Sequence, residues 1–349
     1  MKLDKINQLL DYSLEGIDRT AKALYRYQQK RIIPIKSGIE HLDIIGLGGL
    51  YPDTVVAIGA RPSMGKSYTA NLIRTNILKD PEEDIGVLLW NLEMPFFTLL
   101  MVELKKVLKK SLKEILAAPP TEDEIPLYQQ VTDEFRDHRL TKIDETVTAD
   151  EFYEVTKEYI ERNLEKKQLF IVLDHIGIIR GTNKTESIHD IMENVNRLKL
   201  EYPGKLTFII LCQLNREIEN RWRNKDTNPF VLSPDSSSIY GSDSILFFSD
   251  IVMIQVIPQV VGMEKYALIN RERNPHLEEF ITDDDRNSPK DWVRLKGQNR
   301  IYYHYLKVRL MDGDPTIYGA VLNPEQEEYN IAAAQFEKDM TDNEPELIF

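Results

Sequence analysis

The residues with the clearest chemical signature lie where a short apolar run, residues 54–59, meets a glycine-containing loop. That loop ends in Gly65, Lys66 and Ser67. A phosphate loop consists of a glycine, four residues and then Gly-Lys-Ser/Thr, and in this chain Ala60 occupies the first position. Exposed backbone amides and a helix N-terminus bind phosphate oxygens in such a loop. The segment therefore predicts a nucleotide site.

Within this loop, each functional group has an expected role. The Lys66 ammonium reaches toward the β- and γ-phosphate oxygens, and the Ser67 hydroxyl is a candidate Mg²⁺ ligand. The predicted nucleotide-binding residues are Ala60, Arg61, Pro62, Ser63, Met64, Gly65, Lys66, Ser67 and Tyr68.

Three further polar residues end apolar runs elsewhere in the chain. Asp174 follows residues 169–173, and an aspartate in that position is costly unless it is paired or lies near a metal ion. We expect Asp174 to hold Mg²⁺ together with Ser67. Hydrolysis also requires a group that activates water, and Glu93, just past another apolar run, is the candidate. Gln213 ends a further run, where its amide could sense the γ-phosphate.

The elements that position these residues alternate between strands and helices. Continuous apolar runs separated by helical patterns indicate a mostly parallel sheet covered by helices on both faces, an α/β fold. The expected strands lie at 54–59, 85–92, 168–179, 205–214 and 250–257, and the expected helices at 66–79, 97–117, 149–166 and 186–201. On the 97–117 helix five lysines lie opposite four leucines, which favours a solvated face over a nucleic-acid stripe.

The chain divides into three parts in this interpretation. Apolar residues at spacings of three and four predict an amphipathic helix within residues 1–30, which packs on the following domain or on a neighbouring subunit. Residues 31–330 form the main domain, with a polar surface insertion at about 258–299. Residues 331–349 form an acidic tail.

Composition excludes several classes of protein. The chain has 349 residues, 42% hydrophobic and 29% charged, which is typical of a folded domain rather than a disordered chain. Its single cysteine, Cys212, excludes an internal disulfide framework and a cysteine-based zinc cluster. No run reaches the ~18 apolar residues of a membrane span, and the charged N-terminus is not a secretory signal. We expect a reduced, cytoplasmic protein that does not contact membranes.

Charge is distributed unevenly. The formal net charge is −13, and residues 325–349 contribute −7 of it, so the other 324 residues carry only −6. A local basic channel for nucleic acid is compatible with that balance.

Together the motifs resemble the C-terminal motor domain of the DnaB family of hexameric replicative helicases, over most of residues 31–322. The resembling segments are GARPSMGKS at 59–67, NLEMP at 91–95, VLDHIGII at 172–179, CQLNREIENR at 212–221 and SGIEHLDIIGLGGL at 37–50. The resemblance implies a RecA-like P-loop NTPase core with ATP and Mg²⁺ as cofactors. It also implies a homohexameric ring that translocates on single-stranded DNA and unwinds duplex during replication, in a bacterial or phage-infected cell.

The family also has a Lys-x-Arg on a late strand, whose arginine acts on the neighbouring subunit's ATP. Lys307 and Arg309, followed by Gly313-Asp314-Pro315, correspond to it. The resemblance implies that both complete the catalytic site of the adjacent subunit. Such an arginine finger is worth ~10³–10⁵ in rate.

This chain departs from the family in two respects that concern partners. The family's N-terminal collar, which binds primase, has no counterpart here, and residues 3–28 correspond to its linker helix. We therefore expect a minimal motor of the phage type. The DNA-contacting pore loop corresponds to 233–244 but lacks the family's arginine. The expected DNA-binding residues are Arg180, Lys184, Ser238, Tyr240, Gly241 and Ser242, through backbone contacts and base stacking.

The tail, residues 339–349, is acidic and ends in three apolar residues. It is either a solubilising tail or a docking peptide for a helicase loader, primase or single-strand-binding protein. Two other functions stay open at this point. One is a RecA- or RadA-like recombination ATPase, and the other is a non-enzymatic ring or scaffold subunit.

Overall fold

A computed structural model describes most of the main domain. The described residues are 34–93, 95–181, 183–223, 234–261, 265–267, 292–294, 300–309, 316–322 and 329–331. The predicted helix within residues 1–30, residues 332–349 of the predicted tail and most of the 258–299 insertion lie outside them. The division of the chain into helix, motor and tail stays a prediction.

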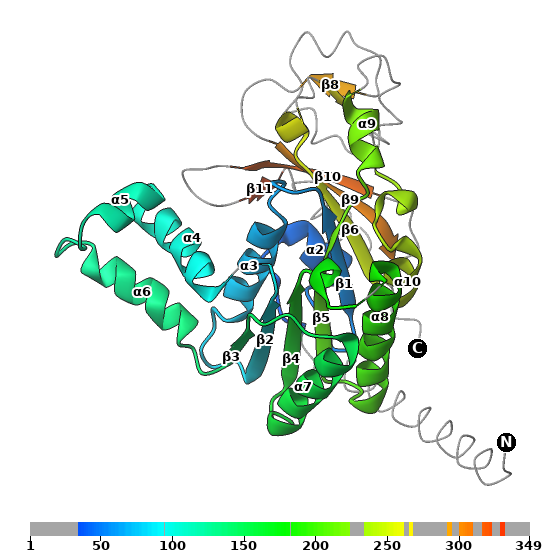
Figure 1. Cartoon of the computed structure of the whole chain (residues 1–349), viewed down its shortest axis with the longest axis horizontal. Helices are drawn as coiled ribbons and strands as arrows, with labels where there is room; N and C mark the ends of the chain where they lie inside the picture. The colour runs from blue at the N-terminus through cyan, green and yellow to red at the C-terminus, as the bar shows by residue number, and fades with distance from the viewer. Residues whose placement is uncertain are drawn as a thin grey trace, which may run out of the picture.

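Within the described residues, nine strands form one sheet in the order β11-β10-β9-β6-β1-β5-β4-β2-β3 (Figure 1). The strands are β1 Val55–Ala60, β2 Ile85–Asn91, β3 Leu140–Ile143, β4 Gln168–Asp174, β5 Leu206–Gln213, β6 Ile251–Val256, β9 Arg300–Val308, β10 Thr316–Leu322 and β11 Tyr329–Ile331. The six strands from β6 to β3 in that order are parallel, and β9, β10 and β11 continue the sheet antiparallel. A separate two-stranded sheet pairs β7 Lys265–Ala267 with β8 Trp292–Arg294.

The helices cover both faces of this sheet. The β1–β2 and β2–β3 connections run along the sheet in one direction, and the β3–β4, β4–β5 and β5–β6 connections run in the other. Because parallel crossovers are right-handed, the two sets of helices lie on opposite faces. The helices are α2 Glu40–Ile45, α3 Lys66–Ile77, α4 Phe96–Leu108, α5 Leu112–Ala117, α6 Ile125–Phe135, α7 Ala149–Arg162, α8 Lys184–Glu201, α9 Glu217–Arg223 and α10 Ser242–Phe248. Figure 1 shows α7, α8 and α10 grouped together and α4, α5 and α6 extending away from the sheet.

The central strands are buried along their whole length. Every residue of β1, β2, β4 and β6 is buried, which explains why their sequences are continuously apolar rather than alternating. The prediction of a mostly parallel α/β fold is confirmed. In the part of the chain that the structure describes, no helix combines the length and apolar character that crossing a bilayer requires.

The single helix expected over 97–117 is wrong, because two helices occupy that range. The backbone of Lys109, just after α4, has a φ of 51°, in the left-handed region that ends a helix. Ser111 then begins α5 with a capping box, in which its hydroxyl accepts from the Glu114 amide and the Glu114 carboxylate accepts from Ser111. The chain therefore turns between the two helices.

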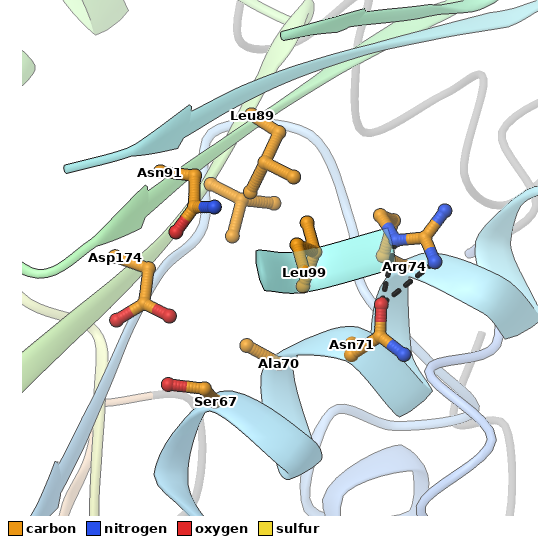
Figure 2. Close-up of a pocket in the computed structure, with 9 residues that line it drawn as sticks. Ser67, Ala70, Asn71, Arg74, Leu89, Asn91, Leu99 and Asp174 are labelled. Atoms are coloured by element: carbon orange, nitrogen blue, oxygen red, sulfur yellow. Dashed lines mark hydrogen bonds between the residues drawn. The ribbon is translucent and has the colours of Figure 1, made fainter. Parts of the chain in front are cut away.

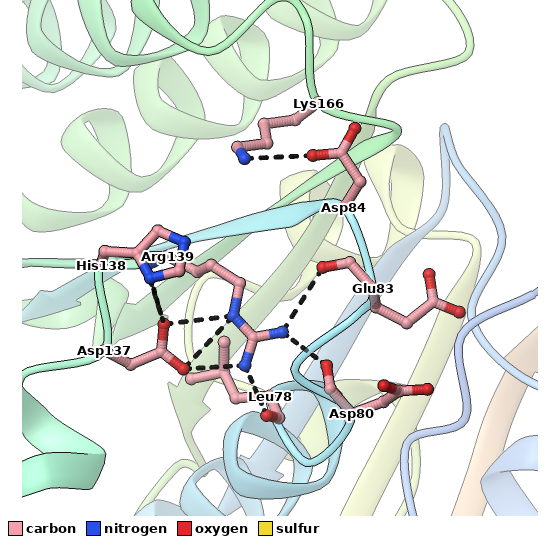
Figure 3. Close-up of polar contacts among 8 residues, drawn as sticks. All are labelled: Leu78, Asp80, Glu83, Asp84, Asp137, His138, Arg139 and Lys166. Atoms are coloured by element: carbon pink, nitrogen blue, oxygen red, sulfur yellow. Dashed lines mark hydrogen bonds and ion pairs between the residues drawn. The ribbon is translucent and has the colours of Figure 1, made fainter.

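A buried arginine holds the edge of the sheet opposite the phosphate loop (Figure 3). The Arg139 guanidinium donates to the backbone carbonyls of Leu78 at 2.7 Å and Asp80 at 2.6 Å, and pairs with the Asp137 carboxylate at 2.8 Å. Its side chain is only 4% exposed. Burial raises the pKa of Asp137, but hydrogen bonds from Arg139 outweigh it and lower the pKa overall. This cluster connects the α3–β2 loop to the start of β3.

Candidate functional site

The predicted phosphate loop joins the end of β1 to the start of α3. Gly65 precedes α3 with a φ of 77°, which glycine adopts without strain. The first helical hydrogen bond is donated by Thr69 to the Gly65 carbonyl, so the preceding amides have no helical acceptor. Lys66 begins the helix and is 9% exposed. The loop thus has the geometry of an anion-binding helix N-terminus.

The loop is held from behind by Gln255 of β6, a residue that the sequence analysis missed. Its amide donates to the Met64 carbonyl and accepts from the Thr69 hydroxyl at 2.7 Å. Gln255 is fully buried and pairs in register with Ala60. A Cβ on Gly65 would lie 2.9 Å from its Nε2, so a side chain there would displace it. A lone polar residue within the apolar run 250–257 was the signal available.

The Arg61 side chain of the same loop turns toward α9. Its guanidinium pairs with Glu219 at 2.5 Å and donates to the Leu214 carbonyl at 2.8 Å. Pro62 and Ser63 are exposed. These contacts connect the phosphate loop to the segment after β5.

Asp174 lies where the Mg²⁺ prediction placed it, at the end of β4 and opposite Ser67 (Figure 2). It is 5% exposed, and burial raises the pKa of its carboxyl, partly offset by a hydrogen bond from Ser67 and by the Lys66 charge. Among the described residues, Oδ1 of Asp174 has no hydrogen-bond partner. A buried, partner-deficient carboxylate oxygen is costly unless a cation or water completes it.

The space beside Asp174 fits a small hydrated ion. A cavity of about 20 Å³ lies between Ser67, Asn91 and Asp174, which is room for about one water or ion. No group of three or more His, Cys, Asp or Glu side chains is placed to hold a metal among the described residues. That is the arrangement Mg²⁺ uses when one carboxylate, waters and substrate phosphates complete its shell. Ser67 and Asp174 therefore fit the ion that the sequence predicted.

Glu93 follows β2 at the same end of the sheet. Its side chain is 42% exposed, and its Oε2 lies 3.9 Å from Nε2 of His175, the residue after Asp174. Leu92 donates its amide to the Asp174 carbonyl at 2.6 Å, which fixes the Glu93 segment against β4. The structure thus brings Glu93, Lys66 and Asp174 together, as predicted. His175 was missed.

A second cavity, of about 340 Å³, opens on the other side of these residues. Its lining includes Gln213 at the end of β5 and Tyr240, two predicted residues. Basic side chains also line it, from Arg61, Lys184 and Arg216. The Gln213 carbonyl accepts from the Tyr240 amide at 3.0 Å, so the end of β5 and the loop around Tyr240 are joined.

The remaining predicted DNA-binding residues differ in their exposure. Arg180 is exposed and pairs with Glu151 at 2.7 Å, and Gly241 has a φ of 70° at the start of α10. Ser238 is 1% exposed, and its hydroxyl donates to Asp235 at 3.0 Å. The Ser238 side chain therefore does not reach the surface in this structure. Ser242 is the first residue of α10, and its side chain lies outside the described part.

Lys307 and Arg309 lie at the opposite end of the sheet from the phosphate loop. Because β9 runs antiparallel, its end is level with the start of β6, and the Arg309 amide donates to Asp250. The Arg309 guanidinium pairs with Asp250 at 2.9 Å and donates to the Phe247 carbonyl at 3.0 Å, to which Lys307 also donates. The length of β1, about 16 Å at 3.3 Å per residue, separates them from the chain's own phosphate loop.

Comparison with known proteins gives the same assignment as the geometry. The family model for the DnaB-like helicase C terminal domain matches residues 34–304. The chain is 25% identical over 241 residues to the replicative DNA helicase DnaB of Helicobacter pylori strain J99, covering 67% of this chain and 48% of that protein. It is 26% identical over 275 residues to DnaB of Buchnera aphidicola subsp. Baizongia pistaciae, covering 77% and 57%. The chain thus spans about half the length of these curated relatives.

Solved structures share the fold. A separately solved ATPase domain superposes with a TM-score of 0.64 at 18% identity, covering 90% of this chain and 97% of that one. A DnaB-like replicative helicase, from a study of its interactions with primase, superposes with a TM-score of 0.62 at 17% identity, covering 89% and 65%. With the family model matching most of the described domain, the chain belongs to the DnaB-like helicase C terminal domain family.

Proposed function

We propose that this protein is an ATP-hydrolysing DNA helicase that works as a homohexameric ring, translocating on single-stranded DNA to unwind duplex during replication. The observation that carries the proposal is the Ser67–Asp174 pair, with a partner-deficient carboxylate oxygen beside the phosphate loop. That arrangement is expensive in a protein without a metal-nucleotide ligand.

The chain's own residues divide the work of hydrolysis. The phosphate-loop amides and Lys66 bind the triphosphate, and Ser67 and Asp174 hold Mg²⁺. The ion, when bound, neutralises charge that develops on the phosphates. Glu93 accepts a proton from the attacking water, a role for which a partly exposed carboxylate beside the phosphate loop is suited.

The site is completed by a neighbouring subunit in this proposal. Arg309 and Lys307 lie too far from their own phosphate loop to contact its nucleotide, since the length of β1 separates them. Arg309 is 52% exposed and therefore accessible to another copy. A head-to-tail ring brings one end of a subunit against the opposite end of the next, and this supports an arginine finger acting in trans.

Single-stranded DNA is proposed to contact the cavity of about 340 Å³ and its rim. Lys184 and Arg180 would bind backbone phosphates, and Tyr240, which is 40% exposed, would stack on a base. The loop amides around Gly241 and Ser242 supply further donors, whereas the buried Ser238 contributes none through its side chain. Such contacts recognise backbone rather than sequence and weaken strongly with salt.

Primase is a proposed partner, because the similar DnaB-like helicase is described with its primase interactions. A loader or a single-strand-binding protein is a proposed partner of the acidic tail, which lies outside the described residues. Deleting residues 340–349 is expected to abolish capture of such a partner while ATP hydrolysis is retained.

The function is tested by ATP hydrolysis with and without an oligo-dT strand, beside fork unwinding. We expect Mg²⁺-dependent, DNA-stimulated hydrolysis that Glu93→Gln reduces by ~10²–10⁴-fold while nucleotide binding persists. Strand exchange without unwinding would indicate a recombination ATPase. Nucleotide binding with no turnover in either protein would indicate a scaffold subunit.

A further inference from the structure

Between the catalytic carboxylate and the DNA-side cavity lies one buried ring. His175 follows Asp174, is 5% exposed, and lies within reach of both Glu93 and Gln213. We propose that His175 is a positioning residue that orients Glu93 and couples it, through Gln213, to occupancy of the cavity of about 340 Å³. This inference rests on the proposed function.

The hydrogen bonds of the ring determine where its proton lies. The backbone N–H of Gly177 donates to Nδ1 of His175 at 3.1 Å, so Nδ1 must be the unprotonated nitrogen. The proton of the neutral ring is therefore on Nε2, which acts as a donor. Nε2 lies 3.1 Å from the side-chain amide of Gln213 and 3.9 Å from the Glu93 carboxylate. Since a donor requires an acceptor, the Gln213 amide turns its oxygen toward the ring.

A neutral donor suits this position. A lysine or arginine beside Glu93 would neutralise the carboxylate and weaken it as a base, whereas an imidazole N–H orients it and leaves its charge intact. Burial lowers the pKa of His175 to about 3, with smaller contributions from Lys66 and Lys184. The single Nε2 proton serves two acceptors, so a shift of Gln213 changes how firmly Glu93 is held.

Both supports of the ring continue into the cavity lining. Gln213 accepts at its carbonyl from the Tyr240 amide, so movement of the Tyr240 loop is transmitted to the end of β5. On the other side, Lys184 donates to the Gly177 carbonyl at 2.8 Å. A DNA phosphate that binds Lys184 competes with that carbonyl and so acts on the turn that fixes Nδ1. His175 and Gly177 themselves line the cavity.

Two substitutions separate the two functions of the ring. In His175→Asn the shorter amide can still accept from the Gly177 N–H but does not reach Glu93. In His175→Gln the longer amide places a donor near the Nε2 position. A third variant, Gly177→Ala, leaves the ring chemistry unchanged but places a Cβ 3.0 Å from its Cε1. His138→Asn is the matched control, because His138 is 84% exposed and lies beside Asp137, away from the site.

The measurements are kcat and KM for ATP with and without oligo-dT. They are paired with the oligo-dT Kd in the presence and absence of a non-hydrolysable ATP analogue with Mg²⁺. We expect His175→Asn to lower kcat ~10–100-fold with KM within about twofold, the size of effect typical of groups that orient a catalytic ligand. The DNA stimulation and the nucleotide-dependent shift in DNA Kd should both fall toward one, because linkage is reciprocal. Gly177→Ala should show a weaker form of this loss, and His175→Gln and His138→Asn should retain coupling.

Each other outcome counts against the proposal in a distinguishable way. If the wild type shows DNA-stimulated hydrolysis and His175→Asn matches it, the relay is refuted and the proposed function stands. If His175→Gln is as impaired as His175→Asn, or both melt at much lower temperature, the ring is only structural and the proposal is wrong. If the wild type neither hydrolyses ATP nor couples nucleotide to DNA, the proposed function fails and the relay fails with it.

Discussion

Replacing Arg309 with alanine is expected to reduce ATP turnover by about 10³-fold or more, the loss typical of removing an arginine finger. Nucleotide affinity should change little, because Arg309 lies at the far end of the sheet from its own phosphate loop. The fold should tolerate the change. Arg309 is 52% exposed, and exposed ion pairs contribute only ~0–1 kcal/mol. Its partner Asp250 keeps Lys199 at 3.0 Å and the Val55 amide at 2.8 Å.

The decisive assay mixes two inactive proteins. Lys66→Ala lacks a working phosphate loop but keeps its finger, and Arg309→Ala has the reverse defect. In rings assembled at 1:1, about a quarter of the head-to-tail interfaces would combine an intact loop with an intact finger, so activity should reappear. Turnover that survives in Arg309→Ala alone, or a mixture that co-assembles and stays inactive, would contradict a site shared between subunits.

Three further predictions concern stability and ion binding. Burial raises the pKa of Asp174, so its ionised form costs stability at neutral pH, and Asp174→Asn should melt at a higher temperature without ligand while losing the Mg²⁺-dependent stabilisation by ATP; calorimetry without that gain would contradict the assignment. Arg139→Ala leaves Asp137 and two carbonyls without their buried donor and should destabilise the fold by about 3–5 kcal/mol in urea titrations, whereas a loss below ~1 kcal/mol would show that the cluster is dispensable. Because the folded-state pKa of Asp137 lies below its unfolded value, its contribution is present above that unfolded value of about 4 and is lost as pH falls through the folded pKa; Asp137→Asn should flatten this acid-side decline in melting temperature, and an unchanged slope would refute the reasoning.

Much of the nucleotide site was predictable because its parts are local or obey a general rule of parallel sheets. Gly65, Lys66 and Ser67 are neighbours in the chain, and a strand–loop–helix pattern is enough to give them a role. Asp174 and Glu93 end separate strands, yet the carboxyl ends of parallel strands meet at one edge. The family resemblance, also drawn from these motifs, is confirmed by the family model.

Other features depend on which strands and helices are neighbours, and a linear pattern does not contain that information. Gln255 supports the phosphate loop only because β6 lies beside β1 in a register that opposes it to Ala60. The single helix expected over 97–117 becomes two, because a left-handed residue and a capping box outweigh the continuous apolar spacing. Ser238 is buried by the bridge between Leu214 and Ile239, which brings distant segments together.

From the order of its residues alone, this chain specifies an α/β nucleotide-binding domain and the side chains that meet phosphate, because short-range backbone geometry and apolar periodicity encode both. Tertiary structure alone places His175 between Glu93 and Gln213, since that contact requires β4 to lie next to β5. It alone also places Arg309 at the far end of the sheet, because β9 runs antiparallel to β6. Strand order and direction arise from long-range packing and burial, which act between segments far apart in the chain.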